Sequence, residues 1–317
     1  MKIRAARERR KELRIARKSR TDIILHRKKR RLKYIAVLPS IVTMVNGACG
    51  FVALVFASRS TEFRWTFFSV RDFNMSSFSL AAYMLLLAMI ADMLDGRVAR
   101  LTRTTSSFGG QLDSLSDAIS FGAAPAFIML KLVESHMANL NFEHIRFSML
   151  IGRGIFFSAI FYAMCAVVRL ARFNVENEDD EAAHMNFAGL PSPAAAGIVV
   201  STVIIHQQIL PRVAVLPQEG FYTFEIITLV VFPVVTFFAG LLMVSRIRYP
   251  HLANQLLRGK KSLTSLLLLF AGVLLIVWNI QLAMVVGFCG YALFGVFRWL
   301  IVTLIKKIRP PEQVANN

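Results

Sequence analysis

The stretch ADMLDGRVARLTRTTSSFGGQLDSLSDAIS, residues 91–120, places four aspartates at the ends of two hydrophobic runs. Asp92 and Asp95 lie near the end of one run, and Asp113 and Asp117 lie at the start of the next. Residues three or four positions apart share one face of a helix, so each pair is expected to point in one direction. Ionisable side chains inside a membrane are costly and mark functional sites. This stretch therefore indicates both a membrane fold and a functional site rich in carboxylates.

Eight hydrophobic runs approach the roughly 20 residues that a helix needs to cross a bilayer. Hydrophobic residues make up 56% of the 317-residue chain and charged residues only 18%, whereas a soluble domain carries about 25% charged residues. We therefore expect an all-α integral membrane protein with about eight transmembrane helices, and not a soluble enzyme. The runs are residues 35–57, 78–94, 112–132, 149–170, 194–209, 224–244, 263–280 and 282–305.

The basic residues divide unevenly between the two sides of these runs. The net charge is +18, and residues 1–34 alone carry 16 Lys or Arg against three acids. With a cytoplasmic amino terminus, 29 basic residues lie on the inner side of the membrane and five on the outer side. Basic residues concentrate on the cytoplasmic side of membrane proteins. We therefore expect a multi-pass protein of the cytoplasmic (inner) membrane, with both termini and the aspartates on the cytoplasmic side.

The basic segment 1–34 is expected to lie on the membrane surface. Its Arg and Lys alternate with Ile, Leu and Ala, which is typical of an amphipathic helix, and each basic residue near an anionic leaflet contributes about 1 kcal/mol. Nucleic acid is a competing partner because basic runs also neutralise phosphates, and a tail that only sets the topology is a third interpretation. Because the tail joins a membrane span directly, we predict anionic lipids as its partner and no nucleic acid.

Four carboxylates at one site repel one another unless cations compensate their charge. Carboxylate oxygens without His or Cys ligands suit Mg²⁺ or Mn²⁺. Two such ions stabilise both the attacking and the leaving oxygen of a phosphoryl group. The alternative is that the acids pair with Arg97, Arg100 and Arg103. The pattern favours a site for two divalent cations, Mg²⁺ or Mn²⁺.

The spacing of this motif resembles the signature of the CDP-alcohol phosphatidyltransferase family. The pattern Asp92-x2-Asp95-Gly96-x2-Ala99-Arg100-x8-Gly109-x3-Asp113-x3-Asp117 agrees with it at all eight fixed positions. The resemblance implies a six-helix membrane core that holds two metal ions, with the last two helices additional to it. It also implies displacement of CMP from a CDP-linked lipid by an alcohol.

The resemblance also implies roles for individual residues. Asp92, Asp95, Asp113 and Asp117 are then the metal-site residues, and Asp117 is also the general base. The residues that face the nucleotide and its diphosphate are then Gly96, Ala99, Arg100 and Gly109.

Four further segments resemble the integral-membrane phosphatidylserine synthase branch of that family. They are LPSIVTMVNGACGF (38–51), CAVVRLARFNV (165–175), FAGLPSPAAAG (187–197) and LLMVSRIRYP (241–250). This resemblance implies CDP-diacylglycerol and L-serine as substrates, and it favours a homodimer. Glycerol phosphate and inositol or its phosphate are the alternative acceptors, and an ion-coupled transporter is the alternative from another class of protein.

Four polar residues outside the motif have two interpretations each. Arg169 and Arg172 lie three positions apart at the end of one run, where they can bind an acceptor carboxylate or anchor the helix end. With the resemblance, we predict that they bind the acceptor or a lipid phosphate. Thr43 and Asn46 can line the nucleotide pocket or bond to neighbouring helices. We include both as candidate nucleotide-binding residues.

These observations divide the chain into four parts. Residues 1–34 are predicted to be a basic cytoplasmic tail, and residues 35–250 the membrane core. Residues 251–308 are predicted to form a hairpin of two helices, and residues 309–317 a second cytoplasmic tail.

Overall fold

The computed structural model describes residues 39–59, 76–102, 107–137, 145–179, 189–213, 215, 217–247, 249 and 263–308. Every regular element in these residues is a helix, which confirms the all-α prediction. The predictions for the basic tail 1–34 and for the tail 309–317 fall outside the described residues.

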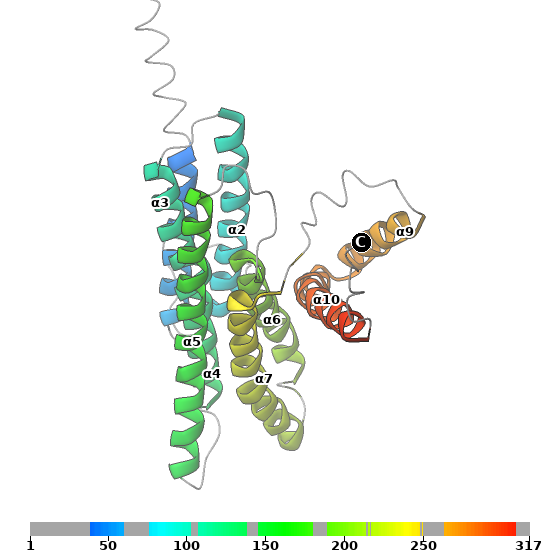
Figure 1. Ribbon diagram of the computed structural model, residues 1–317. Helices are drawn as coiled ribbons and strands as arrows, with labels where there is room; N and C mark the ends of the chain where they lie inside the picture. Colours follow the sequence, from blue (N-terminus) through cyan, green and yellow to red (C-terminus); the bar gives the residue numbers. More distant parts are fainter. Residues whose placement is uncertain are drawn as a thin grey trace, which may run out of the picture.

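The helices run back and forth along a bundle, shown in Figure 1. A first helix, Pro39–Ser58, is followed by α2 (Ser77–Thr102). Helix α3 (Ser107–Asp117) continues through a π-helix, η1 (Ala118–Ala123), into α4 (Ala124–Met137). The bundle is completed by α5 (Ile145–Asp179), α6 (Ser192–Val213) and α7 (Gln218–Val244). Helices α9 (Leu263–Trp278) and α10 (Ile280–Ile308) lie beside the bundle, with α10 next to α6.

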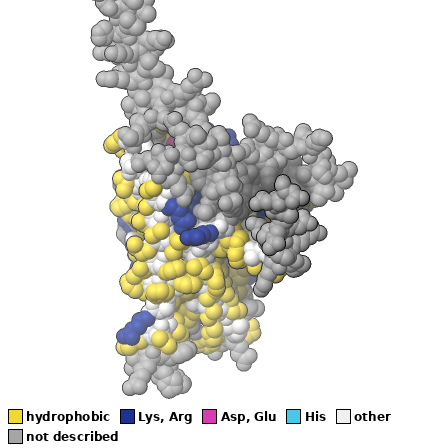
Figure 2. Space-filling model, viewed as in Figure 1, with side chains coloured by type: hydrophobic (Ala, Val, Ile, Leu, Met, Phe, Trp, Pro, Cys, Tyr) yellow, Lys and Arg dark blue, Asp and Glu magenta, His cyan; other side chains and the backbone are white. Residues whose placement is uncertain are grey.

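Seven of the described helices are long and apolar enough to cross a membrane. Large hydrophobic side chains such as Phe51, Phe157 and Val230 are more than half exposed on them, and Figure 2 shows hydrophobic side chains covering most of the described face of the bundle. Such a surface is favourable against lipid and unfavourable in water. The protein is therefore an integral membrane protein. The predicted run 263–280 instead forms the 16-residue helix α9, about 24 Å long and shorter than the other spans.

Small residues allow the helices of the core to pack closely. Ala53, Ala81, Ala82 and Ala195 are completely buried in one cluster with larger aliphatic side chains of α4, α6 and α7. Because successive helices reverse direction, the end of α5 and the start of α6 lie at the end of the bundle that holds the aspartates. The end of α4 and the start of α7 lie at the opposite end.

The π-helix η1 begins directly after Asp117, inside a run that the sequence predicts as one continuous helix. Pro125 has no backbone N–H and cannot bond to the carbonyl of Phe121, four residues earlier. The buried hydroxyl of Tyr162, on α5, donates to that carbonyl at 3.0 Å. Single turns of π-helix inside α-helices occur frequently at functional sites. Here Tyr162 stabilises the turn that follows the aspartates.

A second buried polar cluster lies at the opposite end of the bundle. Nδ1 of His136 (α4) lies 2.5 Å from a carboxylate oxygen of Glu225 (α7), and both side chains are buried. The ring of His206 (α6) packs edge-on against that of His136, and its Nε2 lies 3.1 Å from the hydroxyl of Thr228. These interhelical contacts join α4, α6 and α7 far from the aspartates.

Replacement of Tyr162 by Phe tests the support of η1. The variant leaves a buried carbonyl without its hydroxyl donor, so we expect a loss of about 1–3 kcal/mol of stability. Thermal unfolding in detergent should show a melting temperature lower by several degrees. Tyr222→Phe, at an exposed position of α7, is the matched control and should melt like the original protein. Equal melting of all three proteins would contradict this role of Tyr162.

Candidate active site at the aspartate cluster

Three aspartates meet between α2 and α3. The carboxylates of Asp92, Asp95 and Asp113 each offer an oxygen within 4.8 Å of the others. Oδ1 of Asp113 is buried and has no hydrogen-bond partner. Three converging carboxylates, one of which has a buried oxygen without a hydrogen-bond partner, fit a hard divalent cation such as Mg²⁺ or Mn²⁺. Asp117 lies one helical turn beyond Asp113, outside this three-carboxylate group.

No Lys or Arg side chain in the described part of the chain forms an ion pair with these aspartates. The ion pairs there join Lys131 to Glu134 and His136 to Glu225. Arg97 is exposed, while Arg103 and the Arg100 side chain fall outside the described residues. For Arg97, the alternative of pairing with the aspartates is therefore wrong.

The first helix contributes two buried donors to the aspartates. Nδ2 of Asn46 donates to Oδ1 of Asp117 at 2.8 Å. The hydroxyl of Thr43 lies 2.8 Å from Oδ2 of Asp95 and 3.0 Å from the carbonyl of Pro39. Both side chains are buried, and both donate to a neighbouring helix, which is one of the two roles that the sequence allows them. A nucleotide contact of Thr43 and Asn46 stays a prediction.

Two glycines explain how the first helix comes so close. A Cβ on Gly50 would overlap Ser120, and one on Gly47 would lie 3.1 Å from the Ser116 hydroxyl. The Ser120 hydroxyl in turn donates to the carbonyl of Asn46 at 2.9 Å. Small residues at an interface let helix backbones approach. The glycines of the segment Asn46–Gly50 therefore allow the first helix to pack closely against α3 and η1, which the sequence analysis did not predict.

The remaining motif residues lie on α2 and α3. A Cβ at Gly96 would meet no atom within 4 Å, so packing in the described protein does not require a glycine there. The approach of a ligand to the Gly96 backbone stays a prediction. Gly109 lies in the first turn of α3. Ala99 and Arg100 belong to the last turns of α2, and their side chains fall outside the description.

Arg169 reaches this site from α5. Its Nη1 donates to the Ser192 hydroxyl at 2.7 Å, and its Nε is buried without a hydrogen-bond partner. The guanidinium also interacts electrostatically with Asp117 and Asp92. It therefore combines proximity to the aspartates with an unused buried donor.

A tight turn before α6 places Ser192 beside Arg169. Gly189 has φ +93°, and its N–H donates to the carbonyl of Ile247 at 2.9 Å. The N–H of Leu190 donates to the carbonyl of Leu242 at 2.9 Å. A positive φ favours glycine because it has no Cβ, and a Cβ here would also overlap the carbonyl of Met243. The turn is thus held against the end of α7.

Arg172 and Asn174 follow on α5 and bond to the protein. Nη2 of Arg172 donates to the carbonyl of Val244, the last residue of α7, at 3.1 Å. The Ser114 hydroxyl donates to Oδ1 of Asn174 at 2.9 Å and so links α3 to α5. The predicted acceptor role of Arg172 stays a prediction, since this bond uses only part of its guanidinium.

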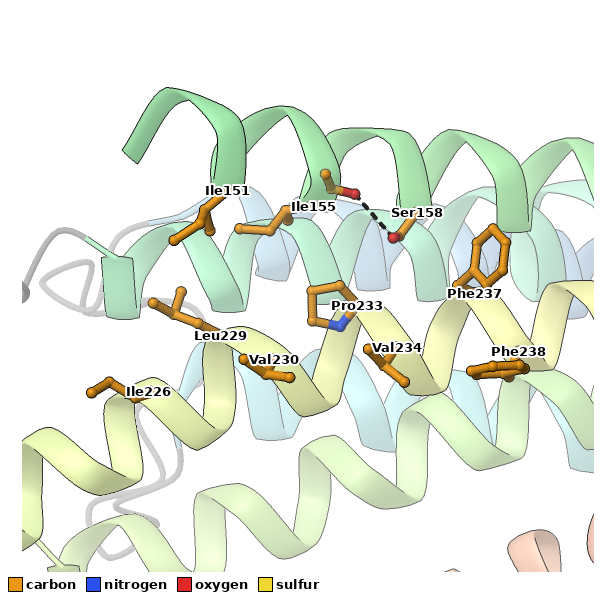
Figure 3. A pocket seen from close by; sticks show the side chains of 11 residues that line it. Ile151, Ile155, Ser158, Ile226, Leu229, Val230, Pro233, Val234, Phe237 and Phe238 are labelled. Atoms are coloured by element: carbon orange, nitrogen blue, oxygen red, sulfur yellow. Dashed lines mark hydrogen bonds between the residues drawn. The ribbon is translucent and has the colours of Figure 1, made fainter. Parts of the chain in front are cut away.

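An apolar cavity of about 490 Å³ lies between α5 and α7, away from the aspartates. Figure 3 shows Ile155, Pro233 and Phe237 among the side chains that face it. Its only polar side chain is that of Ser158, which donates to the Gly154 carbonyl of its own helix. The cavity has no group that could bind a diphosphate, so the candidate active site remains the aspartate cluster.

Comparison with known proteins agrees with this geometry. A family model described as CDP-alcohol phosphatidyltransferase matches residues 36–239. The chain belongs to the CDP-alcohol phosphatidyltransferase family. The protein is therefore a membrane-bound phosphatidyltransferase, which sets aside the transporter alternative. The match lies within the predicted core 35–250, whose exact division from the rest of the chain stays a prediction.

Curated relatives of this phosphatidyltransferase include proteins from bacteria, archaea and the yeast Saccharomyces cerevisiae. A CDP-diacylglycerol–serine O-phosphatidyltransferase of Helicobacter pylori (strain 26695) is 34% identical over 225 residues, which cover 71% of this chain and 81% of the relative. A protein of the same name from Methanocaldococcus jannaschii is 30% identical over 71% of this chain and 79% of its own. An archaetidylserine synthase of Methanothermobacter thermautotrophicus is 30% identical over 68% and 70%.

Replacement of Thr43 by Val tests whether the first helix supports a metal site. The isosteric change removes the donor to Asp95, and loss of a bond that orients a metal ligand weakens metal affinity about 10- to 100-fold. Titration of the phosphatidyltransferase with Mn²⁺, followed by electron paramagnetic resonance, should show a tenfold weaker affinity or more. Thr202→Val is the control, because Thr202 donates to its own helix at Ile198. Unchanged Mn²⁺ affinity in Thr43→Val would refute this support.

Proposed function

We propose that the protein transfers the phosphatidyl group of CDP-diacylglycerol to the hydroxyl of L-serine, giving phosphatidylserine and CMP. The proposal rests mainly on the three-carboxylate cluster of Asp92, Asp95 and Asp113. Asn46 holds Asp117 beside this cluster. The names of the curated relatives support serine as the acceptor. So does Arg169, a cation with a buried unused donor next to the aspartates.

The reaction is a direct displacement at one phosphorus atom. The serine oxygen forms a bond to the phosphorus that carries diacylglycerol, and the bond from that phosphorus to the CMP oxygen breaks. The serine proton passes to Asp117. The bond from Asn46 to Oδ1 orients the Asp117 carboxylate, so that its second oxygen can accept the proton. A positioned general base contributes roughly 10²- to 10⁴-fold to the rate.

Asp92, Asp95 and Asp113 are the proposed ligands of two divalent cations, Mg²⁺ or Mn²⁺, with Asp117 beside them. When bound, such ions neutralise the charge of the diphosphate and of the departing CMP phosphate. The unpartnered Oδ1 of Asp113 supports this assignment. Thr43 holds the Asp95 carboxylate in place.

The nucleotide and its diphosphate are proposed to lie along α2 and the start of α3. Gly96 and Gly109 allow the backbone to approach the nucleotide closely. Ala99 is a further proposed contact of the nucleotide. Arg100 binds diphosphate oxygens, because a guanidinium donates two parallel hydrogen bonds to phosphate. The open space at Gly96 supports this placement.

Arg169 is the proposed partner of the serine carboxylate. Its Nη1 donates to Ser192, which leaves Nε and Nη2 as a pair that matches the two oxygens of a carboxylate. Arg172 already donates to the end of α7, so we assign it to the edge of the acceptor pocket.

The protein is further proposed to reside in the cytoplasmic membrane as a homodimer. The excess of basic residues on one side supports cytoplasmic termini and a cytoplasmic active site. The same charge supports binding of anionic lipids by the tail 1–34.

Purified protein tests the acceptor directly. CDP-diacylglycerol, Mg²⁺ or Mn²⁺, and one alcohol at a time are supplied, and CMP release is measured. We expect rapid release with L-serine and only background with glycerol phosphate, inositol or inositol phosphate. The proposal is falsified if another alcohol releases CMP while L-serine does not.

Replacement of Asp117 by Asn tests the general base. We expect kcat to fall at least about 100-fold, because an amide cannot accept the proton, while binding of CDP-diacylglycerol stays within a few-fold. Glu134→Gln, at an exposed ion pair, is the control and should keep full activity. An active Asp117→Asn variant would remove Asp117 from this role.

Replacement of Arg169 by Ala tests the carboxylate contact. A lost charge-assisted bond is worth about 1.5–3 kcal/mol, so the KM for serine should rise at least tenfold, with the KM for CDP-diacylglycerol changing little. Arg153→Ala, at an exposed position near the start of α5, is the control and should leave both KM values unchanged. Equal rises of both KM values in Arg169→Ala would indicate a structural role.

A further inference from the structure

The start of α6 packs against three of the elements that build the candidate active site. Ala196 of α6 is completely buried in a cluster with Cys49 of the first helix, Ala88 of α2 and Phe121 of η1. Ser192, the first residue of α6, precedes Ala196 by one helical turn. The cluster therefore determines where Ser192 lies relative to the first helix and α2.

Ser192 lies at the same depth in the bundle as two residues of the site. The first helix and α6 run away from the aspartate end, and α2 runs toward it. One turn toward that end from the cluster leads to Asn46 on the first helix, to Asp92 on α2 and to Ser192 on α6. Because neighbouring helices lie side by side there, Ser192 is at the level of the aspartate site.

Arg169 arrives at this level from α5. The Tyr162 hydroxyl donates to the carbonyl of Phe121 at 3.0 Å, and further along α5 the side chain of Asn174 accepts from the Ser114 hydroxyl at 2.9 Å. Arg169 lies between these two contacts, and α5 therefore carries it past the end of α3, where the fourth aspartate of the motif lies.

A single neutral group binds the Arg169 guanidinium. Its Nη1 donates to the hydroxyl of Ser192 at 2.7 Å, and Ser192 is only 1% exposed. Nε of Arg169 is buried without a hydrogen-bond partner. The ion pairs of the described residues do not include Arg169. A buried charge that no protein anion compensates is costly, so the arrangement is suited to an anion from outside the protein.

The backbone that carries Ser192 has little freedom. Pro191 and Pro193 flank it, and the ring of each proline fixes its own φ. The N–H of Leu190 donates to the carbonyl of Leu242 near the end of α7 at 2.9 Å. The Ser192 hydroxyl is therefore a fixed acceptor that the flexible arginine meets.

We propose that Ser192 is a positioning residue, whose hydroxyl holds the Arg169 guanidinium so that its Nε and Nη2 edge faces the acceptor's carboxylate. This inference rests on the proposed function. A long side chain loses rotamer entropy when it binds, and a neighbour that orients it beforehand lowers this cost. A hydroxyl orients the guanidinium through a lone pair and leaves its charge uncompensated, whereas an Asp or Glu would neutralise it.

The test replaces Ser192 by Ala, which removes the hydroxyl and keeps the Cβ. We expect the KM for L-serine to rise about three- to tenfold, the effect of one hydrogen bond, with kcat and the KM for CDP-diacylglycerol within twofold. Ser201→Ala is the matched control, because Ser201 is a buried serine of the same helix that donates to its own helix at Ile198. Equal rises of the serine KM in both variants would overturn the proposal, since they would indicate general packing.

Two further measurements connect Ser192 to the carboxylate through Arg169. In the Arg169→Ala background, Ser192→Ala should add no further rise in the serine KM, because contacting residues that act together are not additive. Ser192→Ala should also narrow the preference for L-serine over L-serine methyl ester, which lacks the charged carboxylate. Independent, multiplicative effects or an unchanged preference would each refute the proposal.

A second substitution grades the effect. Ser192→Cys keeps a side chain of similar size but offers only a weak acceptor, so its serine KM should lie between those of the original protein and Ser192→Ala. It also supplies the test if Ser192→Ala does not fold. A serine KM equal to that of the original protein would refute the role of the hydroxyl.

The outcomes separate this inference from the proposed function. If the original protein releases no CMP with serine, the proposed function fails. If it uses serine and Ser192→Ala keeps the original KM, the proposed function stands and only the role of Ser192 is wrong.

Discussion

The mutual repulsion of Asp92, Asp95 and Asp113 is the constraint on which the rest of the structure depends. Carboxylates with oxygens this close repel one another, and burial near a membrane also removes the water that would screen them. The protein supplies neutral donors and one nearby guanidinium, while an oxygen of Asp113 stays unpartnered. Such a group of carboxylates could hold a metal ion.

The surrounding fold serves to hold these groups in place. Gly47 and Gly50 let the first helix approach α3 and η1, and this approach brings Asn46 to Asp117. On the other side, Tyr162 satisfies the carbonyl that Pro125 leaves free, so η1 keeps its wider turn directly after Asp117. Close packing and one hydroxyl therefore determine where the proposed base lies.

The two buried polar clusters differ in whether all of the buried polar atoms named below have hydrogen-bond partners. At the end far from the aspartates, His136 and Glu225 pair with each other. At the aspartate end, an oxygen of Asp113 and Nε of Arg169 are buried without partners. An unpaired buried polar group is costly, so its presence points to a ligand. The first cluster holds three helices together, and the second is where substrates are proposed to bind.

The sequence by itself determined the membrane helices, the pairing of the aspartates along α2 and α3, and the family. The membrane helices and the pairing follow from hydrophobicity and helical spacing, which depend on neighbours along the chain. The family follows from the resemblance of the motif at residues 92–117 to the family signature. Only the tertiary structure decided the bonds from Asn46 to Asp117 and from Thr43 to Asp95, across 71 and 52 residues. It also decided the π-turn and the place of α10 beside α6. Such contacts depend on how closely helix surfaces approach, which the packing of distant small residues determines and local spacing does not.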